Sequence, residues 1–195
     1  MRMSQLDEIM VRLDRLESVD AIRSLVTAYA IACDEHDMLR LTSLFTEDAV
    51  FTSPNGAMVA NGRDAIADMF VETLKIRGPA FHWTHDVSVT VDVQDPNRAT
   101  GLVYSHAETT PNGVVSLAAM KYFDDYRREE GQWRFAKRVI NFLYYVPAVE
   151  YNTGLNSEHR VVIGADRLAA DYPESLSAWQ DFHRTHVLPG ELQQG

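Results

Sequence analysis

The chain has 195 residues, of which 46% are hydrophobic and 24% charged, with a formal net charge of -10. These values are typical of one globular domain with a sizeable core, with or without an appendage. The negative charge and the lack of a basic cluster argue against a nucleic-acid or anionic-membrane partner. Cys33 is the one cysteine, which excludes an intramolecular disulfide and a multi-cysteine metal site. The acid-rich N-terminus lacks the apolar core of a signal peptide and no run of about 18 apolar residues occurs, so we expect a cytoplasmic protein.

The first part of the chain has the periodicity of helices. Apolar side chains at helical spacing predict an amphipathic helix over residues 4–17. Ser18 or Asp20 can cap a second helix, whose apolar stripe runs towards Asp34 near the buried side. Asp37 is a suitable cap for a third, short helix.

Strands dominate the second part. Short strands are expected at 49–52 and 57–60, and a helix at 63–75 that ends at Gly78-Pro79. Longer period-two stretches then follow at 81–93, 99–109, 114–126 and 133–145. Because tight turns join these strands, they predict an antiparallel meander, and helices followed by a sheet indicate the α+β class.

The end of the chain lies outside this pattern. Pro147 ends the last strand, and helices are expected near 158–171 and 173–186, with Trp179 and Phe182 on one side of the second. We therefore expect a domain at residues 1–147 and a C-terminal extension at 148–195, which packs on the same or a neighbouring subunit. The last residues, ELQQG, are expected to fray.

The stretch FHWTHDVSVTVDV, residues 81–93, has the clearest alternation. Trp83, His85 and Val87 share one parity, and on a regular strand this largely apolar set should line the interior. His85 is then an inward titratable group and a candidate acid/base. The other interpretation is a core histidine that is hydrogen-bonded to a backbone carbonyl.

The remaining motifs argue against a metal or a cofactor. His82 and His85 are three residues apart, so on a strand they face opposite sides and cannot share one ion. No glycine-rich phosphate loop or dinucleotide fingerprint is present. Cys33 lies on an apolar helical stripe, where a packing role is the usual one.

Two further groups can join His85. Asp34 ends a helix that should pack on the sheet, and His106 lies on the adjacent strand. A carboxylate against the far nitrogen of an imidazole fixes its tautomer and raises its basicity, as a general base requires. Whether these groups touch is left open at this point.

The motifs IRSLVTAYAIACDEHDMLRLTSLFTEDAVF, NGRDAI, FHWTHDVSV and GQWRFAKRVI resemble, in this order, the SnoaL-like, nuclear-transport-factor-like superfamily of cone folds. The resemblance covers residues 5 to 145. It is closest in pattern to scytalone dehydratase and hexachlorocyclohexane dehydrochlorinase, and it implies N-terminal helices packed in a curved antiparallel sheet.

The resemblance also implies roles for particular residues. By position, Asp34 and His85 resemble the aspartate–histidine dyad of both enzymes, and His106 resembles a second active-site histidine of the dehydratase. Arg138 resembles an arginine on the last strand of the dehydrochlorinase. Two departures concern the substrate: Cys33 replaces a tyrosine of the dehydratase, and Ala119 replaces a polar residue.

These residues predict a cofactor-independent lyase in which His85, oriented by Asp34, abstracts a proton. A small aromatic or alicyclic substrate would bind among aromatic side chains, namely Tyr29, Phe51, Trp83, Tyr104, Phe142 and Tyr144. Dehydration is favoured, and dehydrohalogenation, formaldehyde release or isomerisation would use the same base. The alternatives are a non-catalytic ligand-binding module and the structural small subunit of an aromatic-ring dioxygenase. By analogy with the dehydratase, we expect a homo-oligomer, a trimer rather than a dimer.

Overall fold

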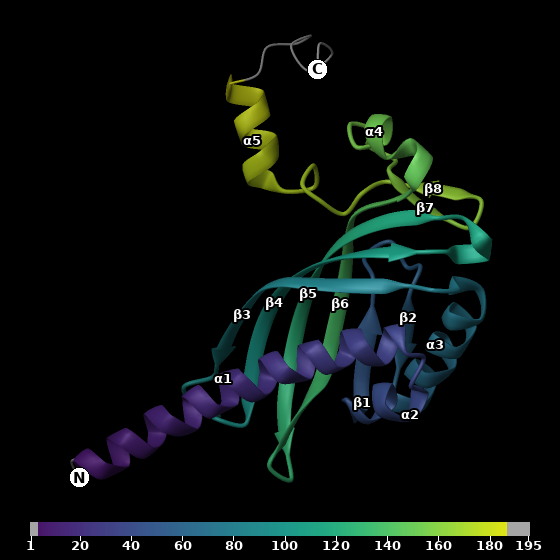
Figure 1. The fold of residues 1–195 in the computed structure, drawn as a ribbon. Helices are drawn as coiled ribbons and strands as arrows, with labels where there is room; N and C mark the ends of the chain where they lie inside the picture. Colours follow the sequence, from purple (N-terminus) through teal and green to yellow (C-terminus); the bar gives the residue numbers. More distant parts are fainter. Residues whose placement is uncertain (1–3, 187–195) are drawn as a thin grey trace.

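The computed structural model describes residues 4–186 and has the expected α+β architecture (Figure 1). The predicted fraying of ELQQG falls outside the described residues. The helices are α1 (Gln5–Asp34), α2 (Met38–Ser43), α3 (Arg63–Arg77), α4 (Tyr151–Gly154) and α5 (Ser177–His186). The strands are β1 (Phe45–Thr52), β2 (Val59–Asn61), β3 (Phe81–Val91), β4 (Arg98–Thr109), β5 (Ser116–Glu129), β6 (Gln132–Pro147), β7 (Val161–Ile163) and β8 (Asp166–Leu168).

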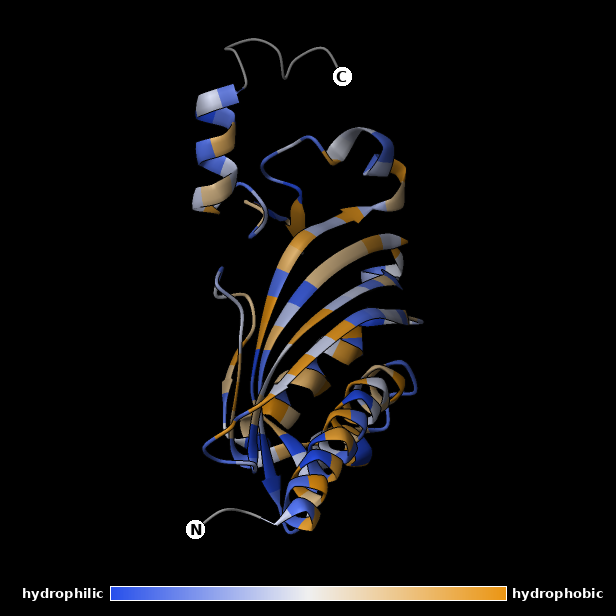
Figure 2. Cartoon of the chain, turned by 90° about the vertical axis from the view of Figure 1, so that its left-hand side faces the viewer, coloured by the Kyte–Doolittle hydropathy of each residue, from blue (hydrophilic) through white to orange (hydrophobic). Residues whose placement is uncertain are grey.

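The strands form one curled, open sheet in the order β2-β1-β6-β5-β4-β3. The meander from β3 to β6 is antiparallel, as predicted, while β1 pairs with β6 in parallel. Figure 2 shows the strong bend of the long strands, with α1 lying along the sheet. The main core fills the space between the sheet and α1, α2 and α3, and aromatic side chains from α1, β1 and β6 meet there. We call the side of the sheet that faces these helices the inner face.

α1 is one continuous helix, so the predicted break near Ser18 is wrong. Ser4 caps its start in a reciprocal capping box with Asp7. Ser18 is buried inside the helix, and no glycine or proline interrupts residues 5–34. The apolar side chains of the first half, such as Leu6 and Leu16, are exposed, and this half extends beyond the sheet (Figure 1).

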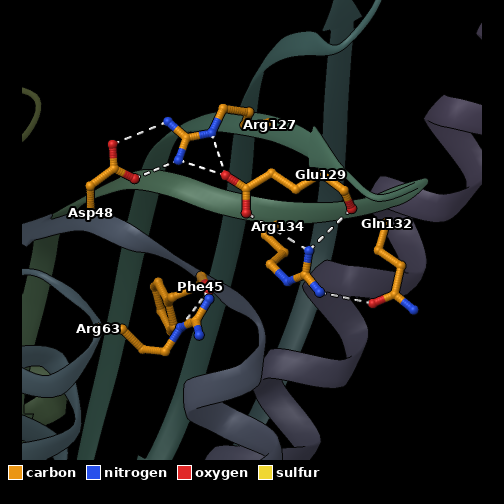
Figure 3. Close-up of polar contacts among 7 residues, drawn as sticks. All are labelled: Phe45, Asp48, Arg63, Arg127, Glu129, Gln132 and Arg134. Carbon is orange, nitrogen blue, oxygen red and sulfur yellow. Dashed lines mark hydrogen bonds and ion pairs between the residues drawn. The ribbon is translucent and has the colours of Figure 1, made fainter.

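Polar contacts fasten β1 and α3 to the sheet at one end (Figure 3). Arg127 on β5 binds Asp48 on β1, with 2.5 Å between Nη2 and Oδ1, and its Nε donates to Glu129. Arg63, at the start of α3, donates through Nε to the carbonyl oxygen of Phe45 at 2.9 Å. These contacts hold β1 and the start of α3 against the rest of the sheet.

In the C-terminal extension, a hairpin that follows α4 takes the place of the helix predicted at 158–171. β7 joins the edge of β6 through the pair Tyr145↔Val161, and Gly164 turns the chain into β8 with a φ of 64°. The buried Arg160 holds the hairpin in place, since it donates to Leu143 O and forms an ion pair with Glu174. The extension therefore contacts its own domain as far as Glu174, whereas α5 has no buried residue.

Within residues 4–186, no helix is both long enough and apolar enough to cross a membrane.

Candidate active site

A bulge in β3 reverses the faces that alternation predicts. Thr84 pairs with Ser105 and Val87 pairs with Val103, so two residues of β3 lie opposite one of β4. His85 and Asp86 are both exposed as a result. The prediction that His85 faces the interior is wrong, because it assumes a regular strand.

His82, on the inner face, is the histidine that meets Asp34. Asp34 ends α1, and its Oδ1 lies 2.5 Å from Nδ1 of His82. The other carboxylate oxygen, Oδ2, accepts the backbone N–H of His82 at 2.8 Å. The His82 side chain is 7% exposed and that of Asp34 is 23% exposed. Asp34 therefore contacts His82, and the predicted pair of Asp34 and His85 is not formed.

This geometry fixes the tautomer of His82. An ionised carboxylate only accepts hydrogen bonds, so Nδ1 carries the proton that is shared with Asp34. In the neutral imidazole with this tautomer, Nε2 keeps its lone pair, and His82 lines a cavity on the inner face. A histidine held in this way is suited to take a proton from a bound molecule.

The cavity next to His82 has a volume of about 190 Å³. Helices α1 and α3, the inner face of the sheet and the β7–β8 turn surround it. Most of its lining is apolar or aromatic, including Tyr29, Phe51, Phe70, Ile76, Met120, Ile140, Phe142, Val162 and Ile163. An engineered cavity of about 150 Å³ holds benzene, so this one can hold a single six-membered ring with small substituents.

The other predicted histidines form a separate cluster on the outer face. His85 Nε2 lies 2.5 Å from His106 Nδ1, and the two rings are stacked with centroids 4.7 Å apart. Nearby, Trp83 donates through Nε1 to Glu108 at 3.3 Å. A groove of about 460 Å³ runs over His85 and His106 and does not include Asp34 or His82.

The ten residues expected at the site thus divide between two faces. Asp34, Tyr29, Phe51, Phe142 and Arg138 lie on the inner side, and His85, His106, Trp83, Tyr104 and Tyr144 lie on the outer face. The structure does not bring His85, His106, Trp83, Tyr104 and Tyr144 to Asp34. Ala119 is on the outer face as well.

Arg138 lies behind the cavity wall and is 1% exposed. Its Nε and Nη2 donate to the two carboxylate oxygens of Asp124 at 2.9 and 2.8 Å. Its guanidinium also lies over the rings of Tyr29 and Tyr122, 4.2 Å from each centroid. Such a paired, stacked arginine holds the two tyrosines in place.

A small void of about 10 Å³ separates this arginine from the histidine. His82, Arg138 and Ser105 are among the residues that line it. Nη1 of Arg138 is buried and has no hydrogen-bond partner among the described residues. The void is close to the size of one water molecule. An ordered water there would satisfy Nη1, which is otherwise costly to bury.

Two tyrosines on the cavity wall stay protonated at neutral pH. Burial raises the pKa of Tyr122 to about 12, although Arg138 opposes the shift. Burial also raises the pKa of Tyr29 well above its usual value. Both hydroxyls are therefore potential hydrogen-bond donors. A third, on Tyr145, lies 2.8 Å from the hydroxyl of Thr109, and both of these residues also line the cavity.

Sequence reasoning missed His82 as the inward histidine and missed Arg77 altogether. Arg77 ends α3 and lines the same cavity as His82. A signal for it exists: the buried stripe of α3 contains Ile66, Phe70 and Leu74, and Arg77 continues that stripe three residues later.

Within residues 4–186, no group of three or more histidine, cysteine, aspartate or glutamate side chains is arranged to hold a metal ion. Cys33 is buried, and burial raises the pKa of its thiol to about 11, so it is not a thiolate at neutral pH.

Comparisons with known proteins agree on one family. The SnoaL-like domain matches residues 14–139. The γ-hexachlorocyclohexane dehydrochlorinase of Sphingobium indicum is 29% identical over 144 residues, which cover 69% of this chain and 86% of that protein.

Solved structures share the fold. A crystal structure of a hexachlorocyclohexane dehydrochlorinase (LinA) of type 2 has a TM-score of 0.64 at 24% identity, over 70% of this chain and 92% of that one. A provisionally named scytalone dehydratase from Novosphingobium aromaticivorans has a TM-score of 0.62 at 22% identity, over 69% and 89%. The family match at residues 14–139 includes most of α1, all of β3 to β5 and the first half of β6. The chain therefore belongs to the SnoaL-like domain family, within the nuclear-transport-factor-like superfamily that its motifs resemble.

Proposed function

We propose that this protein is a cofactor-independent lyase, in which His82 takes a proton from a small cyclic substrate and Asp34 orients and stabilises the imidazolium that forms. The observation that carries the proposal is the contact between Asp34 and Nδ1 of His82 at the wall of an otherwise mostly apolar cavity. The similarity to a dehydrochlorinase supports the same class of reaction.

The reaction is a 1,2-elimination. Nε2 of His82 takes the proton, the C–H electron pair becomes the new double bond, and the leaving group departs from the adjacent carbon with its own bonding pair. Asp34 keeps its negative charge beside the imidazolium, which makes proton transfer more favourable. The proton on His82 is then returned to solvent or to the leaving group.

The leaving group is stabilised by hydroxyl donors on the cavity wall. His106 cannot fill this role from the outer face, so the predicted assistance passes to Tyr122 and to the Thr109–Tyr145 pair. Such donors suit a departing hydroxide or halide. Dehydration and dehydrohalogenation both fit the proposal.

The substrate is a compound of about one six-membered ring. The cavity volume of about 190 Å³ sets this limit. The rings of Phe51, Phe70 and Phe142 offer apolar contact on several sides, as small-molecule sites usually do.

The test is a panel of six-membered rings that carry a leaving group next to an acidic C–H. It includes γ-hexachlorocyclohexane and cyclic β-hydroxyketones, and the unsaturated product is followed by mass spectrometry. We expect product with at least one panel member and none above background with His82→Ala. Equal product formation by folded His82→Ala would refute the proposal.

We also propose that the protein is a homo-oligomer, a trimer rather than a dimer. The outer face of the sheet carries large exposed side chains, among them Phe81, Trp83 and Phe123, which are 56%, 53% and 40% exposed. Exposed aromatic patches of this kind favour association. A monomer by light scattering at micromolar concentration would contradict it, and a Trp83→Glu variant should weaken assembly.

A further inference from the structure

Arg77 is an arginine that faces the candidate active site without an acidic partner. It is partly buried at the end of α3, and it lines the cavity together with His82. No ion pair or side-chain hydrogen bond joins it to any of the residues 4–186. Its carbonyl oxygen, by contrast, accepts hydrogen bonds from both the backbone and the side chain of Thr110, which fixes the backbone at this point.

Within residues 4–186, several other arginines that contact the sheet or the extension have carboxylate partners. Arg127 pairs with Asp48, Arg128 with Asp14, Arg138 with Asp124 and Arg160 with Glu174. A partly desolvated guanidinium normally acquires such a partner, because burying an unpaired charge is unfavourable. Arg63 also lacks a carboxylate, but its Nε donates to the carbonyl oxygen of Phe45. The partly buried side chain of Arg77 has no such partner among the described residues.

The cavity offers no carboxylate to fill that place. None of its lining residues is an aspartate or a glutamate, and Asp34 lies behind His82, which already occupies both of its oxygens. The positive charge of Arg77 also extends into the site, since it lowers the pKa of Cys33 and Tyr122 against the stronger effect of burial. Arg77 thus places a positive charge on the cavity wall of a chain whose net charge is -10.

We propose that Arg77 binds a negatively charged group of the substrate, a carboxylate, and so sets the specificity of the site for small cyclic carboxylic acids. The inference rests on the proposed function, because it assigns a substrate class to the same cavity. Arginine presents two N–H groups in a planar fork that match the two oxygens of a carboxylate. With the charged end held at α3, the apolar ring lies between the phenylalanines, and its C–H groups are presented to His82.

The experiment compares two ligands that differ in charge and hardly in size. Benzoate and its neutral analogue benzamide each have one ring, and their binding to the full-length protein is measured by isothermal titration calorimetry. A hydrogen-bonded charge pair favours benzoate by about ten- to a hundredfold. Benzoate that binds no more tightly than benzamide would overturn the proposal.

Variants identify the arginine. Arg77→Gln should lower benzoate affinity at least about tenfold while leaving benzamide within about twofold, and Arg77→Lys should retain part of the preference. Lys75→Gln is the matched control, because it also removes a positive charge from α3. The Lys75 side chain is exposed and forms an ion pair with Glu72. Loss of the preference in Lys75→Gln, or its persistence in folded Arg77→Gln, would contradict a role for Arg77.

The result is separable from the proposed lyase reaction. Benzoate binding requires no proton transfer, so a preference that depends on Arg77 would remain even if His82→Ala had no effect on turnover. Conversely, a lyase that depends on His82 but shows no benzoate preference would keep the proposed function and remove the carboxylate site. A preference lost in His82→Gln and kept in Arg77→Gln would place the anion on the histidine and also overturn the proposal.

Discussion

Asp34 contacts His82 twice, through Oδ1 to the ring Nδ1 at 2.5 Å and through Oδ2 to the backbone N–H at 2.8 Å. The carboxylate thus fixes both the position of β3 relative to the end of α1 and the orientation of the imidazole. Asp34 thus connects the packing of α1 to the position of the His82 ring, because the same helix carries the core residues Ile22 and Val26.

Asp34→Asn separates these two roles. The amide oxygen can still accept the backbone N–H of His82, so the fold should persist, but an amide cannot stabilise the imidazolium and can hold the wrong tautomer. Turnover per folded molecule should fall by about 10²–10⁴-fold. Steady-state rates on the substrate found in the panel, with circular dichroism as the folding control, measure this.

The Asp34→Asn, His82→Ala double variant tests whether the two residues act as a unit. Groups that share one catalytic step are non-additive, so the double variant should be little slower than His82→Ala alone. Multiplicative losses would mean that Asp34 and His82 act independently.

The buried pair of Arg138 and Asp124 should matter mainly for stability. Asp124→Asn leaves a buried guanidinium without its counter-charge, which costs about 3–5 kcal/mol in the free energy of unfolding. Asp125→Asn, at the exposed neighbouring position of β5, should change it by less than about 0.5 kcal/mol. Urea unfolding of the two variants gives the comparison, and equal stabilities would contradict the structural role of the pair.

Cys33 predicts a loss of stability at alkaline pH. Burial raises the pKa of its thiol from 9.0 to about 11, so the folded state holds the proton more tightly than the unfolded state does. The contribution is complete below about pH 9 and is lost as the pH rises towards 11, by up to about 2 kcal/mol. Urea unfolding from pH 8 to 11 should show a steeper decline for the native protein than for Cys33→Ala. Parallel declines would contradict the assignment.

The β7–β8 turn should form part of the cavity in solution. Ile163→Ala removes apolar surface from the wall, and at about 0.8 kcal/mol per buried methylene it should weaken benzamide binding by about tenfold. Val149→Ala is the control, because Val149 is 87% exposed and does not line the cavity. If Ile163→Ala binds benzamide as tightly as Val149→Ala, the extension does not wall the site.

The architecture was predictable because its signals are local. Period-two patterns and turn residues locate β3 to β6, and Asp37 and Gly78 lie at the expected ends of α2 and α3. Ser18 and Asp20 were misleading, because a residue that can cap a helix does not interrupt one when packing continues on both sides. The stretch 158–171 was also misleading, because pairing with the edge of β6 overrides the helical propensity of a short segment.

The sequence indicated that Asp34 lies near a strand histidine but selected the wrong histidine, for one physical reason. A single extra residue at His85 and Asp86 shifts the alternation of β3, and that bulge is defined only by pairing with β4. His82 and Thr84 before the bulge, and Val87 after it, all face inwards in consequence. The aspartate could be found because it ends a helix, whereas choosing between two histidines required the register.

The comparison of His82→Ala with His85→Ala tests the central claim most directly. Both variants remove one imidazole from β3, one facing the cavity and one on the outer face. We predict that His82→Ala lowers elimination per folded molecule at least about 10²-fold, while His85→Ala stays within about threefold of the native protein. Near-native turnover in folded His82→Ala, or a loss confined to His85→Ala, would contradict the account.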